Sequence, residues 1–254
     1  MKDAVFKSNR YTHIFEMGDA QAVTISGCTF TGNTLYRGSQ DLQPKEAIQL
    51  DVATPSAMSG CVPYNGKGCH NVVIKNCRFQ KVARGLGSHS YSDRGAQANP
   101  YTDITVTKNK FKNLEGEGVF FLQWKNCTIS NNQITRAKRA GIYSQNSKNV
   151  KLVGNTIKNT KAFSGARRAS YGKESNGIFM LATSCSVLSN NQIFNVSTAG
   201  IRLIDRCVSN TLQKNVVSGS KSAPALSINT GSNKNKIQGN TLKKSKNGAE
   251  VVDM

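Results

Sequence analysis

The segment GLGSHSYSDRG, residues 85–95, contains the side-chain types that proton-transfer chemistry requires. His89 is one of three histidines in the chain, and Tyr91, Asp93 and Arg94 follow it closely. An imidazole titrates near neutral pH and can act as a general base, a tyrosine can donate a proton, and an arginine can neutralise a carboxylate. The segment therefore predicts either a catalytic corner or a polar loop, and the elements that carry it decide between the two.

Those elements come from a short repeat that runs through most of the chain. Its unit is an apolar residue, two further residues, an asparagine, one residue and a second apolar residue. Six copies contain Asn109, Asn132, Asn155, Asn191, Asn215 and Asn240 at the fourth position. Two earlier copies have Cys28 and Cys77 there. Most copies recur every 23 to 25 residues, and the longer steps indicate insertions. A period this short predicts a solenoid.

A second type of segment precedes each copy, often after a glycine, as in AIQLD (47–51), GVFFL (118–122) and GIYSQ (141–145). Apolar residues alternate in these segments with a period of two, which indicates strands with one buried face. Helical periodicity is absent. Several short strands in each turn of about 23 residues predict an all-β solenoid, a parallel β-helix of about eight coils with long loop insertions.

The pattern resembles the right-handed parallel β-helix of the pectin-lyase-like superfamily, including its ladder of asparagines at one turn. The resemblance covers nearly the whole chain and implies one single-stranded β-helix domain over residues 1–254. In such a ladder each asparagine side chain satisfies polar groups that would otherwise be buried unpaired. The superfamily includes polysaccharide lyases, uronate epimerases and glycoside hydrolases, so the resemblance implies a carbohydrate-active protein.

The stacking of coils predicts which side chains become neighbours. If Ile48 and Leu86 belong to one inward column, the residues three positions later, Asp51 and His89, face outward one above the other. Paired strands are about 4.8 Å apart. A carboxylate beside an imidazole orients the ring and holds its proton. We therefore expect Asp51 and His89 to form a pair that faces solvent, and the predicted active centre depends on this registration.

Neighbouring columns supply candidate substrate contacts. One position after the inward column come Gln49 and Gly87, where the glycine leaves a gap, and then a stripe of Phe120, Tyr143 and Phe179. An exposed aromatic stripe suits sugar rings, although a loop packed over it explains the pattern equally well.

Two positions before the inward column, Glu46, Arg84 and Glu117 form a ladder of alternating charge. The ladder is either cross-strand pairing or, at Arg84, a cation for a substrate carboxylate.

The insertions fall at residues 31–45, 52–70, 90–101 and 159–175, and insertions in repeat proteins commonly build the binding face. Besides the residues after His89, they supply the candidate substrate contacts Tyr64, Tyr101, Arg167 and Arg168. The basic run GARRASYGK, residues 165–173, could hold sulfate or carboxylate groups, or could be a solvated loop.

β-Elimination on an acidic, uronate-containing polysaccharide is the leading hypothesis. The reaction needs a base for the C5 proton, a cation for the uronate carboxylate and an acid for the leaving oxygen. We assign His89 as the base, Arg84 or Arg94 as the cation, and Tyr91 or Tyr64 as the acid. Uronate epimerases share the proton-abstraction step.

Neither a cofactor nor a metal is expected. A calcium site would need clustered acids, and only Asp41, Glu46 and Asp51 fall in one region.

Two other functions stay open. The first is a non-catalytic glycan-binding adhesin or phage tail-spike segment. The second is a glycoside hydrolase that pairs Asp51 with Glu46 or Asp93. Polygalacturonase-like members of the superfamily carry an adjacent pair of aspartates, and no Asp-Asp dipeptide occurs here, which weighs against the hydrolase.

Composition narrows the partner and the location. The 34 lysines and arginines against 14 acids give a net charge of +20, which favours an anionic polysaccharide as partner. Nucleic acid ranks last because no motif supports it, and no apolar run approaches the ~20 residues of a membrane span. The N-terminus has no signal segment, and the repeat already runs at Ile14, so we expect the chain to be trimmed at its N-terminus. We expect the protein to be extracellular or at the cell surface. Because seven is an odd number, at least one cysteine is unpaired or pairs between chains, and a disulfide from Cys61 to Cys69 could close a short loop.

Overall fold

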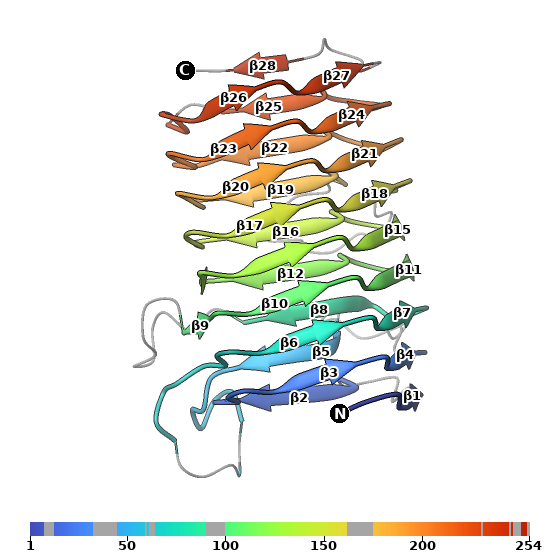
Figure 1. Ribbon diagram of the computed structural model, residues 1–254, viewed down its shortest axis with the longest axis vertical. Helices are drawn as coiled ribbons and strands as arrows, with labels where there is room; N and C mark the ends of the chain where they lie inside the picture. The colour runs from blue at the N-terminus through green and yellow to red at the C-terminus, as the bar shows by residue number, and fades with distance from the viewer. Residues whose placement is uncertain are drawn as a thin grey trace.

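Three long parallel sheets wrap around one axis, coil upon coil (Figure 1). The computed structural model describes residues 1–7, 13–32, 45–58, 60, 64–89, 100–161, 175–229, 231–243, 245 and 250–252. The second sheet has eight strands, one from each of eight coils, as the sequence predicts. No helix in the described part of the chain has the length and apolarity needed to span a membrane.

The first sheet carries the segments that follow the glycines. Its strands are β2 (Phe15–Gly18), β5 (Glu46–Asp51), β8 (Arg84–Ser88), β12 (Val119–Leu122), β16 (Ile142–Gln145), β19 (Ile178–Leu181), β22 (Ile201–Ile204), β25 (Leu226–Ile228) and β28 (Glu250–Val252).

The second sheet ends at the asparagine turn. Its strands are β3 (Thr24–Ser26), β6 (Val73–Lys75), β10 (Thr105–Thr107), β14 (Thr128–Ser130), β17 (Lys151–Val153), β20 (Val187–Ser189), β23 (Thr211–Gln213) and β26 (Lys236–Gln238).

The third sheet begins after that turn. Its strands are β1 (Val5–Lys7), β4 (Thr29–Thr31), β7 (Arg78–Gln80), β11 (Lys110–Leu114), β15 (Gln133–Ala137), β18 (Thr156–Lys158), β21 (Gln192–Phe194), β24 (Val216–Ser218) and β27 (Thr241–Lys243). A short fourth pairing joins β9 (Tyr101–Thr102) to β13 (Trp124–Lys125).

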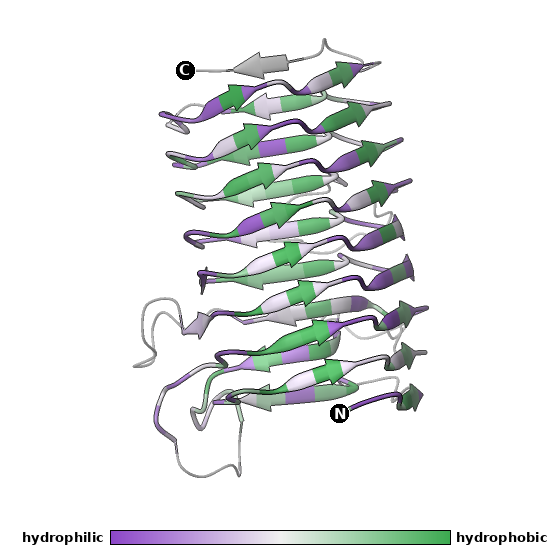
Figure 2. Cartoon of the chain, viewed as in Figure 1, coloured by the Kyte–Doolittle hydropathy of each residue, from purple (hydrophilic) through white to green (hydrophobic). Residues whose placement is uncertain are grey.

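The core consists of inward columns that repeat from coil to coil, visible as green bands along the strands in Figure 2. The predicted column is confirmed, because Ile48 pairs with Leu86, Leu86 with Val119, and Val119 with Ile142, all of them buried. In the third sheet, Phe30, Phe79 and Phe111 stack with ring centroids 4.6 to 5.0 Å apart. Like residues in register therefore fill the interior without any helix covering the sheets in the described residues.

The glycine at the start of several first-sheet strands is required by packing. A Cβ atom on Gly141 would lie 2.6 Å from Cγ2 of Ile157 and 2.9 Å from the carbonyl oxygen of Gly177. Both distances are too short for a side chain. The glycine therefore lets the first sheet approach the inward residues of the third sheet.

The asparagine turn forms the expected hydrogen-bonded ladder. The amide nitrogen Nδ2 of Asn132 donates to Oδ1 of Asn155 at 3.0 Å and to the carbonyl oxygen of Val106 at 2.9 Å. The residue before the ladder position adopts left-handed φ, 55° at Asn131. Cys77 occupies the same turn, and its backbone amide donates to Oδ1 of Asn109 at 2.9 Å. The ladder satisfies the buried polar groups of the turn.

The described cysteines are free thiols. Cys69 is buried, and its thiol donates to the carbonyl oxygen of Met17 at 3.3 Å. The suggested disulfide from Cys69 is therefore not formed, and Cys61 lies outside the described residues.

We predict that Asn155→Ala lowers the free energy of unfolding by about 2–4 kcal/mol, because four ladder hydrogen bonds are lost and buried partners stay unsatisfied. Chemical denaturation measures the change. Gln133→Ala, at an exposed position of the neighbouring strand, is the control and should change stability by less than about 0.5 kcal/mol. Equal losses for the two variants would contradict a structural ladder.

Candidate functional site

The backbone at His89 is fixed on both sides. The hydroxyl of Ser88 at the end of β8 accepts hydrogen bonds from the amide of Leu122 at 3.0 Å and from the indole of Trp124 at 2.9 Å. The carbonyl oxygen of His89 accepts a hydrogen bond from the hydroxyl of Tyr101 at 3.1 Å. His89 is therefore held at the point where the chain leaves the first sheet.

Asp51 and His89 lie on the same wall, as the columns predict. Leu50 pairs with Ser88, and the next residues bring Oδ2 of Asp51 within 4.0 Å of Nδ1 of His89. The expectation that both face solvent is wrong for Asp51, whose side chain is 0% exposed, against 39% for His89. The pair is thus an accessible imidazole with a buried carboxylate behind it.

Gln49 connects the pair to the first coil. Its amide nitrogen donates to Oδ2 of Asp51 and, at 3.0 Å, to Oε1 of Glu16 in β2. The same nitrogen lies 3.5 Å from Nδ1 of His89. No open gap exists beside Gly87, because a Cβ atom there would lie 2.5 Å from Cγ of Glu46, whose side chain fills that space. Gln49 is buried, which does not fit its predicted direct contact with substrate.

His13 belongs to the site and was missed in the sequence. Its Nδ1 lies 3.1 Å from Oε2 of Glu46 and 3.2 Å from the backbone amide of Glu46. When Nδ1 carries a proton it can donate a hydrogen bond to the carboxylate, and when it carries none it can accept one from the amide. The ring can therefore bind Glu46 in either state without moving. The His13 and His89 rings are 6.2 Å apart and nearly perpendicular. Because Phe15 pairs with Ile48, extending the column of Glu46 by one coil would have found His13.

The charge ladder is confirmed as a buried ion network. Arg84 donates from Nε to Oε2 of Glu117 at 2.8 Å and from Nη1 to Oε1 of Glu46. Its guanidinium carbon lies 3.8 Å from the ring centroid of Phe120. Nη1 of Arg139 approaches Glu117 at 3.8 Å. Arg84 is buried and bound to two carboxylates, which does not fit its predicted role as the cation for a substrate carboxylate.

Burial and the charges of this network shift the pKa values of Glu46 and His89. Burial alone would raise the pKa of Glu46, but the charge of Arg84 and the contact with His13 lower it to about 2. Burial lowers the pKa of His89 below its ordinary value and outweighs the opposing carboxylates of Glu46 and Asp51. At neutral pH the imidazole of His89 is therefore the basic, uncharged form.

The aromatic stripe is buried rather than exposed. Phe120, Tyr143 and Phe179 stack at centroid distances of 4.7 and 5.2 Å and form a second apolar cluster with Leu122 and Ala140. Their predicted contacts with sugar rings do not fit this burial.

Tyr101, Glu46 and Tyr64 complete the described candidates for substrate contact. Tyr101 and Glu46 are fully buried, so direct contact with a polymer is excluded for both side chains. Tyr64 is exposed, and its hydroxyl accepts a hydrogen bond from the amide of Gly60 at 2.8 Å. The remaining candidates lie outside the described residues: Tyr91, Asp93, Arg94, Arg167 and Arg168. Among the residues that the structure describes, no three His, Cys, Asp or Glu side chains group as they would around a metal ion.

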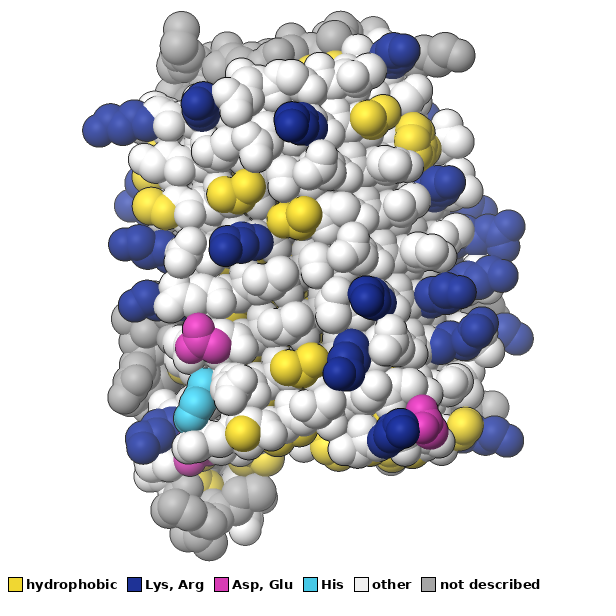
Figure 3. All heavy atoms as spheres, viewed as in Figure 1, with side chains coloured by type: hydrophobic (Ala, Val, Ile, Leu, Met, Phe, Trp, Pro, Cys, Tyr) yellow, Lys and Arg dark blue, Asp and Glu magenta, His cyan; other side chains and the backbone are white. Residues whose placement is uncertain are grey.

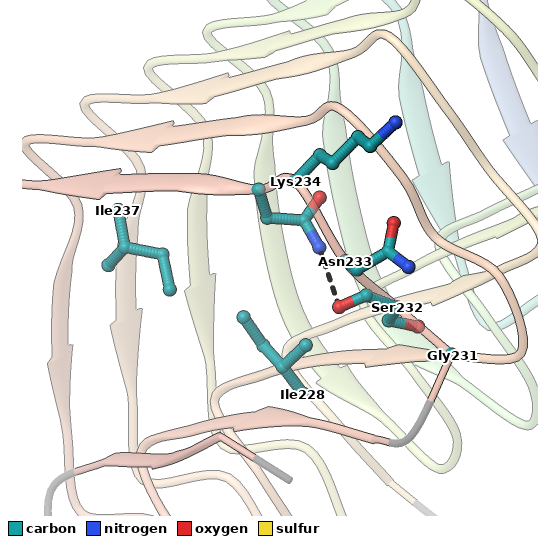
Figure 4. A pocket seen from close by; sticks show the side chains of 7 residues that line it. Ile228, Gly231, Ser232, Asn233, Lys234 and Ile237 are labelled. Carbon is teal, nitrogen blue, oxygen red and sulfur yellow. Dashed lines mark hydrogen bonds between the residues drawn. The ribbon is translucent and has the colours of Figure 1, made fainter. Parts of the chain in front are cut away.

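A cavity of about 380 Å³ lies near the C-terminal end of the solenoid (Figure 4). Its described lining runs from Ile228 to Ile237 and is mostly apolar, with Lys234 as the one titratable side chain. Such a lining has no acid–base pair, in contrast to the wall around His89.

Arg84→Met should lower the free energy of unfolding by about 3–5 kcal/mol, because the buried carboxylates of Glu46 and Glu117 both lose the guanidinium that pairs with them. Urea denaturation measures the loss. The matched control is Arg206→Met, which removes an exposed pair with Asp205 at 3.6 Å and should cost less than about 1 kcal/mol. A similarly small loss for Arg84→Met would show that the ion network contributes little to the free energy of unfolding.

Glu46 should make stability depend on acid. Its pKa is about 2 in the folded chain against 4.5 ordinarily, so its ionised form stabilises the fold fully above about pH 4.5 and the effect is lost as the pH falls toward 2. The contribution is on the order of 3 kcal/mol. Unfolding of wild type and Glu46→Gln should differ most near neutral pH and converge in acid. A difference that stays constant with pH would contradict the assignment.

Comparisons with known proteins agree with this architecture. The family described as right handed beta helix region matches residues 1–157 and again residues 94–253. No curated protein matches the sequence significantly. Among solved structures, the periplasmic alginate epimerase AlgG is similar over 94% of this chain and 48% of its own, at 13% identity and a TM-score of 0.62.

Two other similar structures have different roles. The surface adhesin PfbA of Streptococcus pneumoniae matches over 98% of this chain and 59% of its own, at 16% identity and a TM-score of 0.56. The enzymatically active domain of tailspike protein 2 of bacteriophage CBA120 matches over 92% and 34%, at 13% identity and a TM-score of 0.57. This chain thus spans about a third to three fifths of these structures, and the likeness shows the fold. The chain belongs to the right-handed β-helix family.

Proposed function

We propose that the protein acts on an acidic polysaccharide by removing the C5 proton of a uronate residue, with His89 as the base. The observation that carries the proposal is the half-exposed imidazole of lowered pKa with the Asp51 carboxylate 4.0 Å behind it. A base for this proton must be uncharged before the reaction and stabilised once it is protonated. The lowered pKa of His89 supports the first requirement, and the nearby carboxylate of Asp51 supports the second.

The leading reaction is β-elimination. Nδ1 of His89 lies toward Asp51 and Gln49, so we assign Nε2 as the atom that takes the C5 proton. The electron pair of the broken C–H bond forms a C4–C5 double bond while the bond from C4 to the glycosidic oxygen breaks. The leaving oxygen then takes a proton from an acid. Reprotonation of C5 from the opposite face, without loss of the leaving group, would instead give epimerisation.

His13 is our candidate for the acid. Its ring lies 6.2 Å from that of His89, and Nδ1 contacts the carboxylate of Glu46. The wall thus carries two imidazoles, each with its own carboxylate, which are the two proton-transfer groups that elimination requires. Tyr91, as the alternative acid, and Arg94, as the cation for the uronate carboxylate, remain predictions from the sequence.

The similar structures support this class of function and its location. One is an epimerase of alginate, and the others are a surface adhesin and a tailspike protein. They favour a polysaccharide partner and a place outside the cytoplasm, which we extend to this chain as part of the proposal. The net charge of +20 favours an anionic polymer.

A glycan-binding protein without turnover is the second candidate. It is favoured by the similarity to PfbA along 98% of this chain. A hydrolase that pairs Asp51 with Glu46 has little support, because both carboxylates are fully buried and a hydrolytic pair must reach the glycosidic bond.

His89→Ala should abolish turnover, by at least about 100-fold, because the base is lost. Its free energy of unfolding should change by less than about 1 kcal/mol, since the side chain is 39% exposed. Ultraviolet absorbance of the C4–C5 double bond, with a panel of uronate and sulfated polysaccharides, measures elimination, and proton NMR of the polymer measures epimerisation. His70→Ala is the control and should keep full activity. Retained activity with a large loss of stability would make His89 a packing residue.

The pH profile gives an independent test. Because burial lowers the pKa of His89, the acid limb of kcat/KM should have its midpoint below about pH 6.5, the ordinary value for an imidazole. Asp51→Asn should shift this midpoint to still lower pH, because the carboxylate raises the pKa of His89. A midpoint well above that of a free imidazole, or no shift in Asp51→Asn, would remove His89 from the role of base.

A further inference from the structure

Charges are segregated among the three sheets. Every acidic residue within a described strand lies in the first sheet, at Glu16, Glu46, Asp51 and Glu250. The strands of the second and third sheets contain no aspartate or glutamate among the described residues. The excess of positive charge therefore falls on faces of the solenoid away from His89.

The third sheet carries the densest group of cations. We call it the basic face, and it consists of Arg78, Lys81, Lys108, Lys110, Lys112, Arg136 and Lys158. All seven side chains are exposed. They come from β7, β11, β15 and β18 and from the turns beside them. Figure 3 shows dark-blue side chains gathered along the edge of the molecule where these strands lie.

Register brings like charges together on this face. Arg78 and Lys110 are direct partners on adjacent strands, about 4.8 Å apart by the spacing of paired strands. Lys112 and Lys158 lie in one column, each paired with Thr135 between them. Like charges directly opposite each other destabilise a sheet.

The described carboxylates do not offset this repulsion. In the described part of the chain, none of the seven cations has a carboxylate within 4.0 Å. Glu115, which follows β11, is instead paired with Lys138 at 2.5 Å. The positive charge of the basic face is therefore available to bind an external anion.

The arrangement fits a linear polymer better than a small anion. The cations follow the solenoid axis over four successive coils, on an exposed sheet rather than in a pocket. A chain that carries a carboxylate or a sulfate on successive sugars can contact several of these cations at once, and such weak contacts add. Single-stranded nucleic acid needs aromatic platforms for its bases as well. Phe194, an aromatic residue in β21 beside the face, has the ammonium of Lys158 5.4 Å from its ring centroid.

We propose that the basic face is a second binding surface, without catalytic groups, for a carboxylated or sulfated polysaccharide that runs along the solenoid axis. It lies on a different sheet from His89 and does not depend on the reaction proposed there. Binding at this face would hold a long polymer on the protein whether or not His89 acts on it.

The test compares two triple variants that lose the same charge. Arg78→Gln, Lys110→Gln and Lys112→Gln together remove the centre of the basic face. Lys125→Gln, Lys148→Gln and Lys234→Gln together remove three exposed lysines that lie outside the third sheet, one in β13 and two in turns. Calorimetric titration with heparin and with polygalacturonate should give about tenfold weaker binding for the first variant and less than about twofold for the second. Thermal unfolding should show that both variants stay folded.

Three results would overturn the proposal. Equal weakening in both variants would mean that net charge alone attracts the polymer, and unchanged binding in the first would mean that the face is not used. Single-stranded DNA of equal charge binding more tightly than both glycans, with loss in the first variant alone, would assign the face to nucleic acid. Failure at His89 is distinguishable, because it removes turnover of short oligosaccharides and leaves these titrations unchanged.

Discussion

In-register hydrogen bonding of each coil on the next is the constraint on which the rest of the structure depends. It converts a difference of about 23 residues in the sequence into one strand spacing of about 4.8 Å. The ladder fixes the register at one turn, because Asn132 can reach Asn155 only when the coils are aligned. The glycine column fixes it at another, since only glycine tolerates the approach of the third sheet at Gly141. Every side chain on the walls takes its neighbours from this register.

Register is also why part of the site could be predicted from the sequence. Counting along the repeat places Asp51 beside His89 and Arg84 between Glu46 and Glu117, and the structure has both contacts. Exposure could not be predicted in the same way, because it depends on what covers the outward wall. Period-two alternation says that a side chain leaves the core, but it says nothing about the segments that then pack over it. Phe120 therefore pairs as expected and is nevertheless buried.

The buried ion network is not explained by stability. Buried ion pairs cost desolvation, and well-packed apolar side chains often replace them without loss. The first sheet has such apolar packing in the following coils, where Phe120, Tyr143 and Phe179 form a buried aromatic cluster. The charged groups begin beside His13 and His89 and continue into those coils through Glu117 and Arg139. The desolvation cost of burying Glu46 and Arg84 is explained if their charges set the protonation of His13 and His89.

In the proposed reaction, the carboxylates would stabilise His89 once it is protonated. Before proton transfer, burial keeps His89 uncharged, so its attraction to the carboxylates is small. When His89 takes the C5 proton it becomes a cation, with Asp51 4.0 Å away and Glu46 also raising its pKa. The carboxylates thus act on the charge that develops in the reaction and little on the starting state, and only such differential interactions accelerate a chemical step. Glu46 and Asp51 both raise the pKa of His89, and Oδ2 of Asp51 lies 4.0 Å from its Nδ1, so both carboxylates would stabilise that developing charge even though Arg84 partly offsets Glu46.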